Sequence, residues 1–225
     1  MWLICGVDRL PRTCAVGLAA GLVGYSHTAG LAIPGRRHPV AQALLGTALA
    51  ALTRAPLGLR GDAARSGLRL GLTAAALVGA GVAGATAIPA VRSAMRARDV
   101  PTPGWKWLTV EIPLGTVWAE EAMYRGALAT TAAAAFGPRR GRLLQAVAFG
   151  LSHIIDARGA GEPVIATVLV TGAAGWVFGW LGERSGSILA PVLAHLAINE
   201  AGAVAALAVQ RRAAAGGCLP PVPPV

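Results

Sequence analysis

Three short polar patterns interrupt an otherwise apolar sequence, and their residue types could together perform hydrolysis. They are AEEAMYRG at 119–126, FGLSH at 149–153 and HLAIN at 195–199. Between them they contribute two carboxylates, a guanidinium, two imidazoles and a carboxamide: Glu120, Glu121, Arg125, His153, His195 and Asn199. Ionisable groups are costly inside a membrane segment and usually mark function there, so this set predicts a site.

Helical spacing gives the two carboxylates different surroundings. Glu121 and Arg125 are four residues apart, share one helix face and are expected to form a buried ion pair. Glu120 points about 100° away from Glu121 and is expected to face a polar cavity. The same i, i+4 spacing aligns each histidine with another residue of its own pattern: Phe149 with His153, and His195 with Asn199.

Two hydrolytic mechanisms fit these groups. In the first, Glu120 takes a proton from a water that His153 helps to position, and the water attacks a peptide carbonyl. His195 and Asn199 would then donate hydrogen bonds to the oxyanion. In the second, Glu120, His153 and His195 bind a divalent metal such as zinc and leave one position open for water. Because the HExxH helix common in zinc proteases is missing, we expect no cofactor and keep zinc as the alternative.

The elements that carry these groups are expected to be membrane helices. The chain of 225 residues is 55% hydrophobic and only 13% charged, whereas soluble domains are about 25% charged. Its formal charge of +10 could suggest nucleic acid, but the arginines punctuate apolar runs and form no stripe with aromatics, which argues against that partner. The three cysteines form no CxxC pair and predict neither a disulfide framework nor a metal site.

Seven apolar runs predict an all-α, polytopic bundle of about 6–8 transmembrane helices, placed in the cell membrane. About 20 residues are needed to cross the bilayer, and five runs have roughly that length or more: 13–33, 70–91, 107–136, 162–182 and 187–210. Runs 40–53 and 143–156 are shorter and suit tilted or interior helices. We expect N-terminal membrane helices over 1–104, a catalytic core over 105–210 and a disordered proline-rich tail over 211–225.

Helix lengths test whether the polar groups can meet. With one span between them, the helices of His153 and His195 should run parallel, and a rise of 1.5 Å per residue puts both imidazoles at similar depth. The same arithmetic puts Glu120 about 10 Å deeper on an antiparallel helix. A shared site therefore requires tilt, an earlier helix end or a kink near Pro113.

Glycine spacing predicts where helix backbones approach closely. Gly17 and Gly21 have GxxxG spacing. Four further glycines recur at i, i+3, i+7 and i+10 along one helix face: Gly172, Gly175, Gly179 and Gly182.

The three polar patterns resemble the motifs EExxxR, FxxxH and HxxxN of the CPBP family of CAAX-type and bacteriocin-processing endopeptidases. They occur in that order, in separate hydrophobic segments and without substitution, and the resemblance covers roughly residues 105–205. It implies an all-helical intramembrane protease that hydrolyses a membrane-associated peptide or protein. By this resemblance, Glu120 and His153 would activate water, and His195 and Asn199 would stabilise the oxyanion.

The resemblance also makes Glu121 and Arg125 the supporting ion pair, in agreement with their spacing. The Ala-, Arg- and Gly-rich composition, with Lys106 as the single lysine, suggests a GC-rich bacterial genome, where prenylated CAAX substrates are unexpected. We therefore expect bacterial peptide processing or self-immunity. Two alternatives remain: a non-catalytic membrane scaffold or immunity protein, and a small transporter with a Glu/His proton relay.

Overall fold

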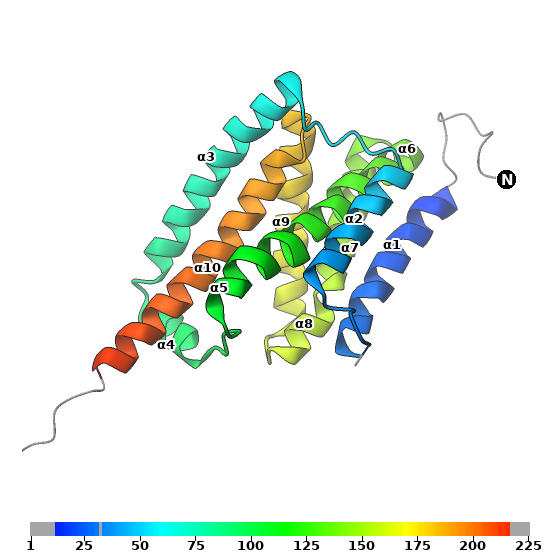
Figure 1. Ribbon diagram of the computed structural model, residues 1–225. Helices are drawn as coiled ribbons and strands as arrows, with labels where there is room; N and C mark the ends of the chain where they lie inside the picture. The colour runs from blue at the N-terminus through cyan, green and yellow to red at the C-terminus, as the bar shows by residue number, and fades with distance from the viewer. Residues whose placement is uncertain (1–11, 32, 217–225) are drawn as a thin grey trace, which may run out of the picture.

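The computed structural model describes residues 12–31 and 33–216, and every regular element in these ranges is a helix (Figure 1). This confirms the all-α prediction for the described part of the chain. In chain order the elements are α1 (Arg12–His27), η1 (Thr28–Gly30), α2 (Pro39–Leu52), α3 (Gly61–Ala85), α4 (Pro89–Ala97), α5 (Gly104–Lys106), η2 (Trp107–Trp118), η3 (Glu121–Leu128), α6 (Ala129–Phe136), α7 (Pro138–Ser152), α8 (Ile154–Gly159), α9 (Val164–Ser185) and α10 (Leu189–Gly216).

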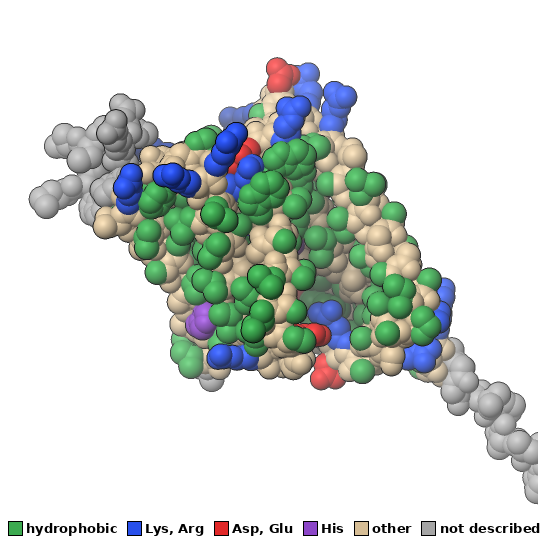
Figure 2. Space-filling model, turned by 180° about the vertical axis from the view of Figure 1, so that it is seen from behind, with side chains coloured by type: hydrophobic (Ala, Val, Ile, Leu, Met, Phe, Trp, Pro, Cys, Tyr) green, Lys and Arg blue, Asp and Glu red, His purple; other side chains and the backbone are tan. Residues whose placement is uncertain are grey.

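All seven predicted apolar runs form helix, and the two short runs become α2 and α7. By length and composition, three described helices could cross a membrane: Gly61–Ala85, Val164–Ser185 and Leu189–Ala214. Figure 2 shows Lys and Arg side chains gathered at the two ends of the body, with hydrophobic side chains between them, which is the distribution of a membrane protein. Helix α10 continues to Gly216, past the expected boundary at 210. The rest of the expected tail, 217–225, lies outside the described residues.

Small residues let two pairs of helices pack closely. A Cβ added to Gly150 of α7 would lie 2.6 Å from the carbonyl oxygen of Val168 in α9, and one added to Gly175 would lie 2.9 Å from Phe149. The predicted glycine face is therefore confirmed against α7 for Gly172, Gly175 and Gly179, whereas Gly182 meets Pro191 of α10 at 3.8 Å. The same expectation for Gly17 and Gly21 is wrong, because no atom of another element lies within 4 Å of a Cβ at either position.

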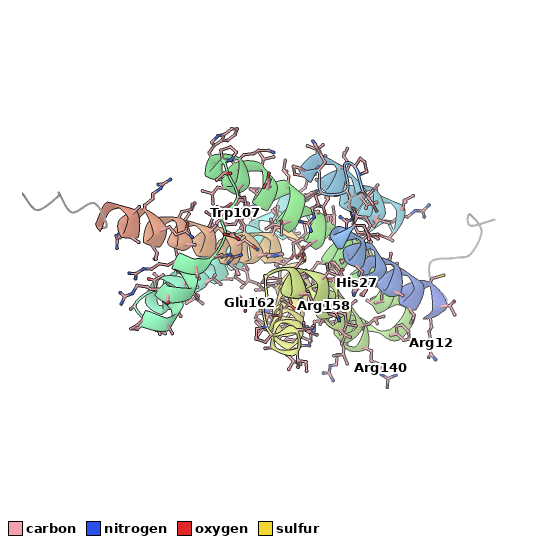
Figure 3. All side chains as sticks on the ribbon, turned by 90° about the horizontal axis from the view of Figure 1, so that it is seen from below. Arg12, His27, Trp107, Arg140, Arg158 and Glu162 are labelled. Atoms are coloured by element: carbon pink, nitrogen blue, oxygen red, sulfur yellow. The ribbon has the colours of Figure 1, made fainter. Side chains whose placement is uncertain are left out.

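A second close approach, between α3 and α10, had not been expected. Gly67 of α3 faces Ser187, and Gly71 faces Ala190 and Leu193, so the two helices run side by side in the same direction (Figure 1). Viewed from below (Figure 3), α10, α3 and α4 occupy one side of the bundle, and α1, α2 and α7 occupy the other.

A continuous helical segment from Gly104 to Phe136 carries both carboxylates across the bundle. Much of it, η2 and η3, is wound as π-helix, which is uncommon in proteins and concentrates at functional sites. Pro113 lies inside η2, where the missing backbone N–H disturbs regular α-helical bonding. Glu120 lies at the junction between η2 and η3. The irregular winding falls where the depth argument required a departure from a straight helix.

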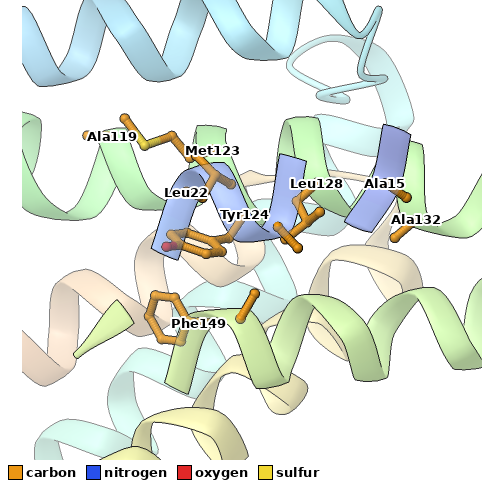
Figure 4. Close-up of a cluster of buried hydrophobic side chains, with 10 residues drawn as sticks. Ala15, Leu22, Ala119, Met123, Tyr124, Leu128, Ala132 and Phe149 are labelled. Atoms are coloured by element: carbon orange, nitrogen blue, oxygen red, sulfur yellow. The ribbon is translucent and has the colours of Figure 1, made fainter. Parts of the chain in front are cut away.

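A cluster of buried hydrophobic side chains fixes this segment against α1 and α7 (Figure 4). Ala15 and Leu22 of α1 pack with Met123 and Leu128, which are 4% and 0% exposed. Phe149 of α7 belongs to the same cluster. Helix α7, which leads to His153, is thereby held against the helical segment that carries the two carboxylates.

Candidate active site

Glu121 and Arg125 form the buried ion pair that their spacing predicted. The Arg125 Nη1 atom lies 3.0 Å from Glu121 Oε1, and the two side chains are 2% and 0% exposed. The guanidinium also lies over the Phe149 ring, with its carbon 3.9 Å from the ring centre. Complementary charge and the aromatic face together offset the cost of burying both ions.

Glu121 has a second partner that its spacing did not predict. The Nδ1 atom of His195, from α10, lies 2.8 Å from Glu121 Oε1. A carboxylate paired with a guanidinium acts as an acceptor, so Nδ1 of His195 donates this hydrogen bond. Glu121 therefore fixes both the position and the tautomer of the imidazole, as second-layer carboxylates commonly do for functional histidines.

Glu120 is the more accessible carboxylate and faces the other edge of the same imidazole. Its Oε2 atom lies 3.9 Å from His195 Nε2, and its side chain is 28% exposed. This oxygen is itself buried and has no hydrogen-bond partner among the described residues. The pattern of one paired carboxylate and one that faces the site agrees with the helical spacing of Glu120 and Glu121.

His153 reaches the same region from the end of α7. It is the residue that caps α7, and its Nδ1 lies 2.8 Å from the carbonyl oxygen of Phe149. With Nδ1 donating to that carbonyl, Nε2 remains as the acceptor. The Phe149 ring centre is 4.7 Å from that of His153 and 6.0 Å from that of His195, so both imidazoles border one aromatic ring. No direct hydrogen bond joins His153 to Glu120 in the described part of the chain.

Asn199 lies one turn beyond His195 on α10. Its Nδ2 atom donates to the backbone carbonyl of His195 at 3.2 Å. A carboxamide nitrogen carries two N–H groups, so one remains for another acceptor. The structure thus joins Glu120, Glu121 and His195 directly, connects His153 through Phe149, and holds Asn199 against its own helix.

Two residues of this cluster had no sequence signal. The Phe178 ring of α9 stacks on His195 with centres 5.1 Å apart and planes at 25°, and Arg125 lies 5.0 Å above the same ring. Gln145 of α7 is fully buried, and it lines a cavity of about 70 Å³ together with Arg125. A phenylalanine in a glycine-rich helix predicts only packing, because its contact with a particular histidine depends on how two helices are placed.

The metal-binding alternative can be compared with this geometry. Within residues 12–31 and 33–216, no group of three or more His, Cys, Asp or Glu side chains is placed to hold a metal ion. Glu120 and Nε2 of His195 approach one another at 3.9 Å, and the Nδ1 hydrogen bond to Glu121 leaves Nε2 free, but no hydrogen bond or ion pair joins His153 to either residue in the described part of the chain. Zinc dependence of Glu120, His153 and His195 therefore stays an untested alternative that gains no support from the arrangement.

These helices and this cluster define a helical membrane protein that gathers carboxylate, imidazole and carboxamide groups inside its bundle. Comparison with protein families gives a match over residues 102–201 to the family described as "Type II CAAX prenyl endopeptidase Rce1-like". The matched region contains all three polar motifs, which confirms the resemblance to CAAX-type proteases. Over this region the chain is similar to that family, whose members are hydrolases of the peptidase class. No curated protein and no solved structure matches the chain.

Proposed function

We propose that the chain is an intramembrane endopeptidase in which Glu120 and His153 activate a water molecule for attack on a peptide carbonyl. The observation that carries this proposal is the contrast between the two adjacent carboxylates. One oxygen of Glu121 is paired with both Arg125 and His195 and its side chain is 0% exposed, whereas Glu120 is 28% exposed and its Oε2 atom lies unpartnered 3.9 Å from the histidine. An acceptor oxygen in this position is suited to take a proton from water.

The proposed reaction needs no covalent intermediate. Water bound between Glu120 and Nε2 of His153 transfers a proton to the carboxylate as its oxygen adds to the carbonyl carbon. The resulting tetrahedral oxyanion collapses, the C–N bond breaks, and the proton passes from Glu120 to the departing amine. General base catalysis of this kind contributes about 10²–10⁴-fold to the rate.

His195 and Asn199 are the proposed hydrogen-bond donors to the oxyanion. Because Nδ1 of His195 already donates to Glu121, donation from Nε2 to the oxyanion uses the protonated imidazolium, which Glu121 holds and faces from the opposite side of the ring. Phe178, stacked on the imidazole, restricts its rotation. Donors that are held in place before reaction contribute most to stabilising the developing charge, because they need no reorganisation.

The proposed substrate is a peptide or protein that reaches the site from the membrane. The apolar band in Figure 2 and the three apolar helices support a multi-pass protein of the cell membrane. Bacterial peptide processing or self-immunity is the proposed role, on the composition of the sequence. A carboxylate inside the bundle limits access to segments that can enter between the helices.

A Glu120→Gln variant tests the proposal against a matched control. Glu111→Gln removes a carboxylate from the same helical segment, where Glu111 pairs with Lys106 at 3.3 Å on the surface. Peptide termini would be compared in membrane fractions of cells that carry wild type, Glu120→Gln or Glu111→Gln at matched abundance. We expect termini that depend on wild type and on Glu111→Gln and that are lost with Glu120→Gln. Equal cleavage by Glu120→Gln would show that another group is the base.

A further inference from the structure

Three arginines from two helices line one open hollow of about 610 Å³ at an end of the bundle. Arg65 and Arg69 come from α3 and Arg184 from the last turn of α9, with Ser66 and Thr73 also in the lining. At this end, which is uppermost in Figure 1, α3 and α10 begin and α9 ends. None of the proposed catalytic residues borders the hollow.

The hollow carries an excess of positive charge. Its single carboxylate, Asp62, lies 3.6 Å from Arg65, but both side chains are largely exposed, so this pair is weak. Arg69 and Arg184 have no carboxylate within ion-pair distance among the described residues. The neighbouring Arg142, by contrast, is paired with Glu183 at 2.8 Å. Guanidinium groups that share a hollow repel one another, and a bound anion would offset that repulsion.

The backbone around the hollow is held in place by close contacts. A Cβ on Gly67 would lie 2.7 Å from Ser187, so α3 packs directly against the turn between α9 and α10. The Ile188 amide donates to the Leu57 carbonyl at 3.0 Å and ties the segment before α3 to the same turn. The arginines therefore project from a fixed frame and not from a free surface loop.

We propose that this hollow binds a phosphate group, carried by the headgroup of an anionic phospholipid. Guanidinium groups match phosphate oxygens with paired, charge-assisted hydrogen bonds. The hydroxyl of Ser66 is a further donor on the same face of α3. Exposed apolar side chains begin on α3 between the two arginines, at Leu68, and continue beyond them at Leu72 and Leu77. A lipid could thus place its phosphate on the arginines and its acyl chains beside these leucines.

Binding would be measured on the purified full chain in detergent with short-chain phosphatidylglycerol, and with phosphatidylcholine as the zwitterionic comparison. The test variant is Arg69→Gln/Arg184→Gln. The matched control is Arg139→Gln/Arg140→Gln, which removes two exposed arginines from the start of α7. The ion pair between Arg142 of α7 and Glu183 of α9 shows that the start of α7 lies beside the end of α9. Both double variants therefore remove two positive charges from the same end of the bundle.

We expect wild type and the control to bind phosphatidylglycerol alike, and the Kd of the test variant to rise about tenfold or more. Competition by inorganic phosphate would show that the phosphate itself is recognised. If the hollow bound inorganic phosphate but did not prefer phosphatidylglycerol over phosphatidylcholine, its ligand would be free phosphate and not a lipid headgroup. Equal weakening of phosphatidylglycerol binding in both double variants, or no weakening in either, would overturn the proposal.

If the test variant failed to fold, the single Arg184→Gln would replace it, with Arg140→Gln as its control. Because lipid binding requires no cleavage, this result is independent of the proposed catalytic mechanism.

Discussion

Replacing Arg125 with methionine should destabilise the bundle strongly, because it leaves a fully buried carboxylate without its cation. Glu121 would keep only the hydrogen bond from His195, in a setting where its side chain is 0% exposed. Methionine retains most of the aliphatic packing, so the change isolates the charge. Removing one partner of a buried ion pair costs about 3–5 kcal/mol. For a chain of this size each kcal/mol lowers Tm by about 2–4 °C, so we expect a loss of about 6–20 °C.

A double variant separates an uncompensated charge from lost packing. Glu121→Gln/Arg125→Met removes both charges and keeps an amide oxygen that can accept from His195. Replacing a buried ion pair as a whole is often close to neutral, so the double variant should melt within about 4 °C of wild type. Thermal unfolding in detergent can be followed by the fluorescence of the 6 tryptophans.

Two results would refute this reasoning. One is an Arg125→Met variant that melts with wild type, since the pair would then contribute nothing measurable. The other is a double variant as unstable as Arg125→Met alone. In that case the loss would come from packing of the guanidinium on Phe149 and Phe178, and not from the charge left on Glu121.

Three further predictions concern the packing of α7 on α9, the stacking on His195 and the dependence of cleavage on metal. Gly150→Ala should lower Tm by about 5 °C or more, because its Cβ would meet the Val168 carbonyl at 2.6 Å. The control Gly17→Ala, with open space around it, should leave Tm unchanged or raise it. Equal Tm changes in the two variants would contradict the packing argument. Phe178→Ala should reduce the cleavage rate by more than any loss of folded protein explains, because it frees the stacked His195 ring. Cleavage rates would be compared at equal concentrations of folded protein, with Phe178→Leu as the control for side-chain volume. Unchanged rates would show that Phe178 is not part of the site. Dialysis against a zinc chelator should leave cleavage intact if Glu120 and His153 act without metal; activity that is lost on dialysis and restored by zinc alone would favour the metal mechanism.

Much of the local structure could be predicted from the sequence. Each of the seven apolar runs predicted from the sequence forms helix in the structure. Burial in lipid or in a helical core requires long stretches with few charges, and such stretches are visible in the sequence. The spacing of Glu121 and Arg125 predicted their pairing, since residues four apart on a helix are neighbours whatever surrounds them. The glycine repeat in α9 likewise predicted a packed face, because its regular spacing lines one side of the helix.

Other expectations depended on partners that no local pattern identifies. Gly17 and Gly21 have the spacing of a packing motif, but α1 presents them to open space, so spacing alone did not decide packing. Gly67 and Gly71 have the same four-residue spacing and do pack against α10. Which face of a helix is covered is set by the rotation of that helix in the bundle, and single-helix periodicity leaves it open.

The sequence by itself determined the chemical groups, their helices and the pairs within one helix. Tertiary structure decided that His195 bonds Glu121 across 74 residues, that Phe178 stacks on its ring, and that arginines of α3 and α9 share a hollow. These contacts join helices far apart in the chain. They depend on the crossing, rotation and depth of each helix, which follow from the packing of the whole bundle and not from the spacing of residues along any one segment.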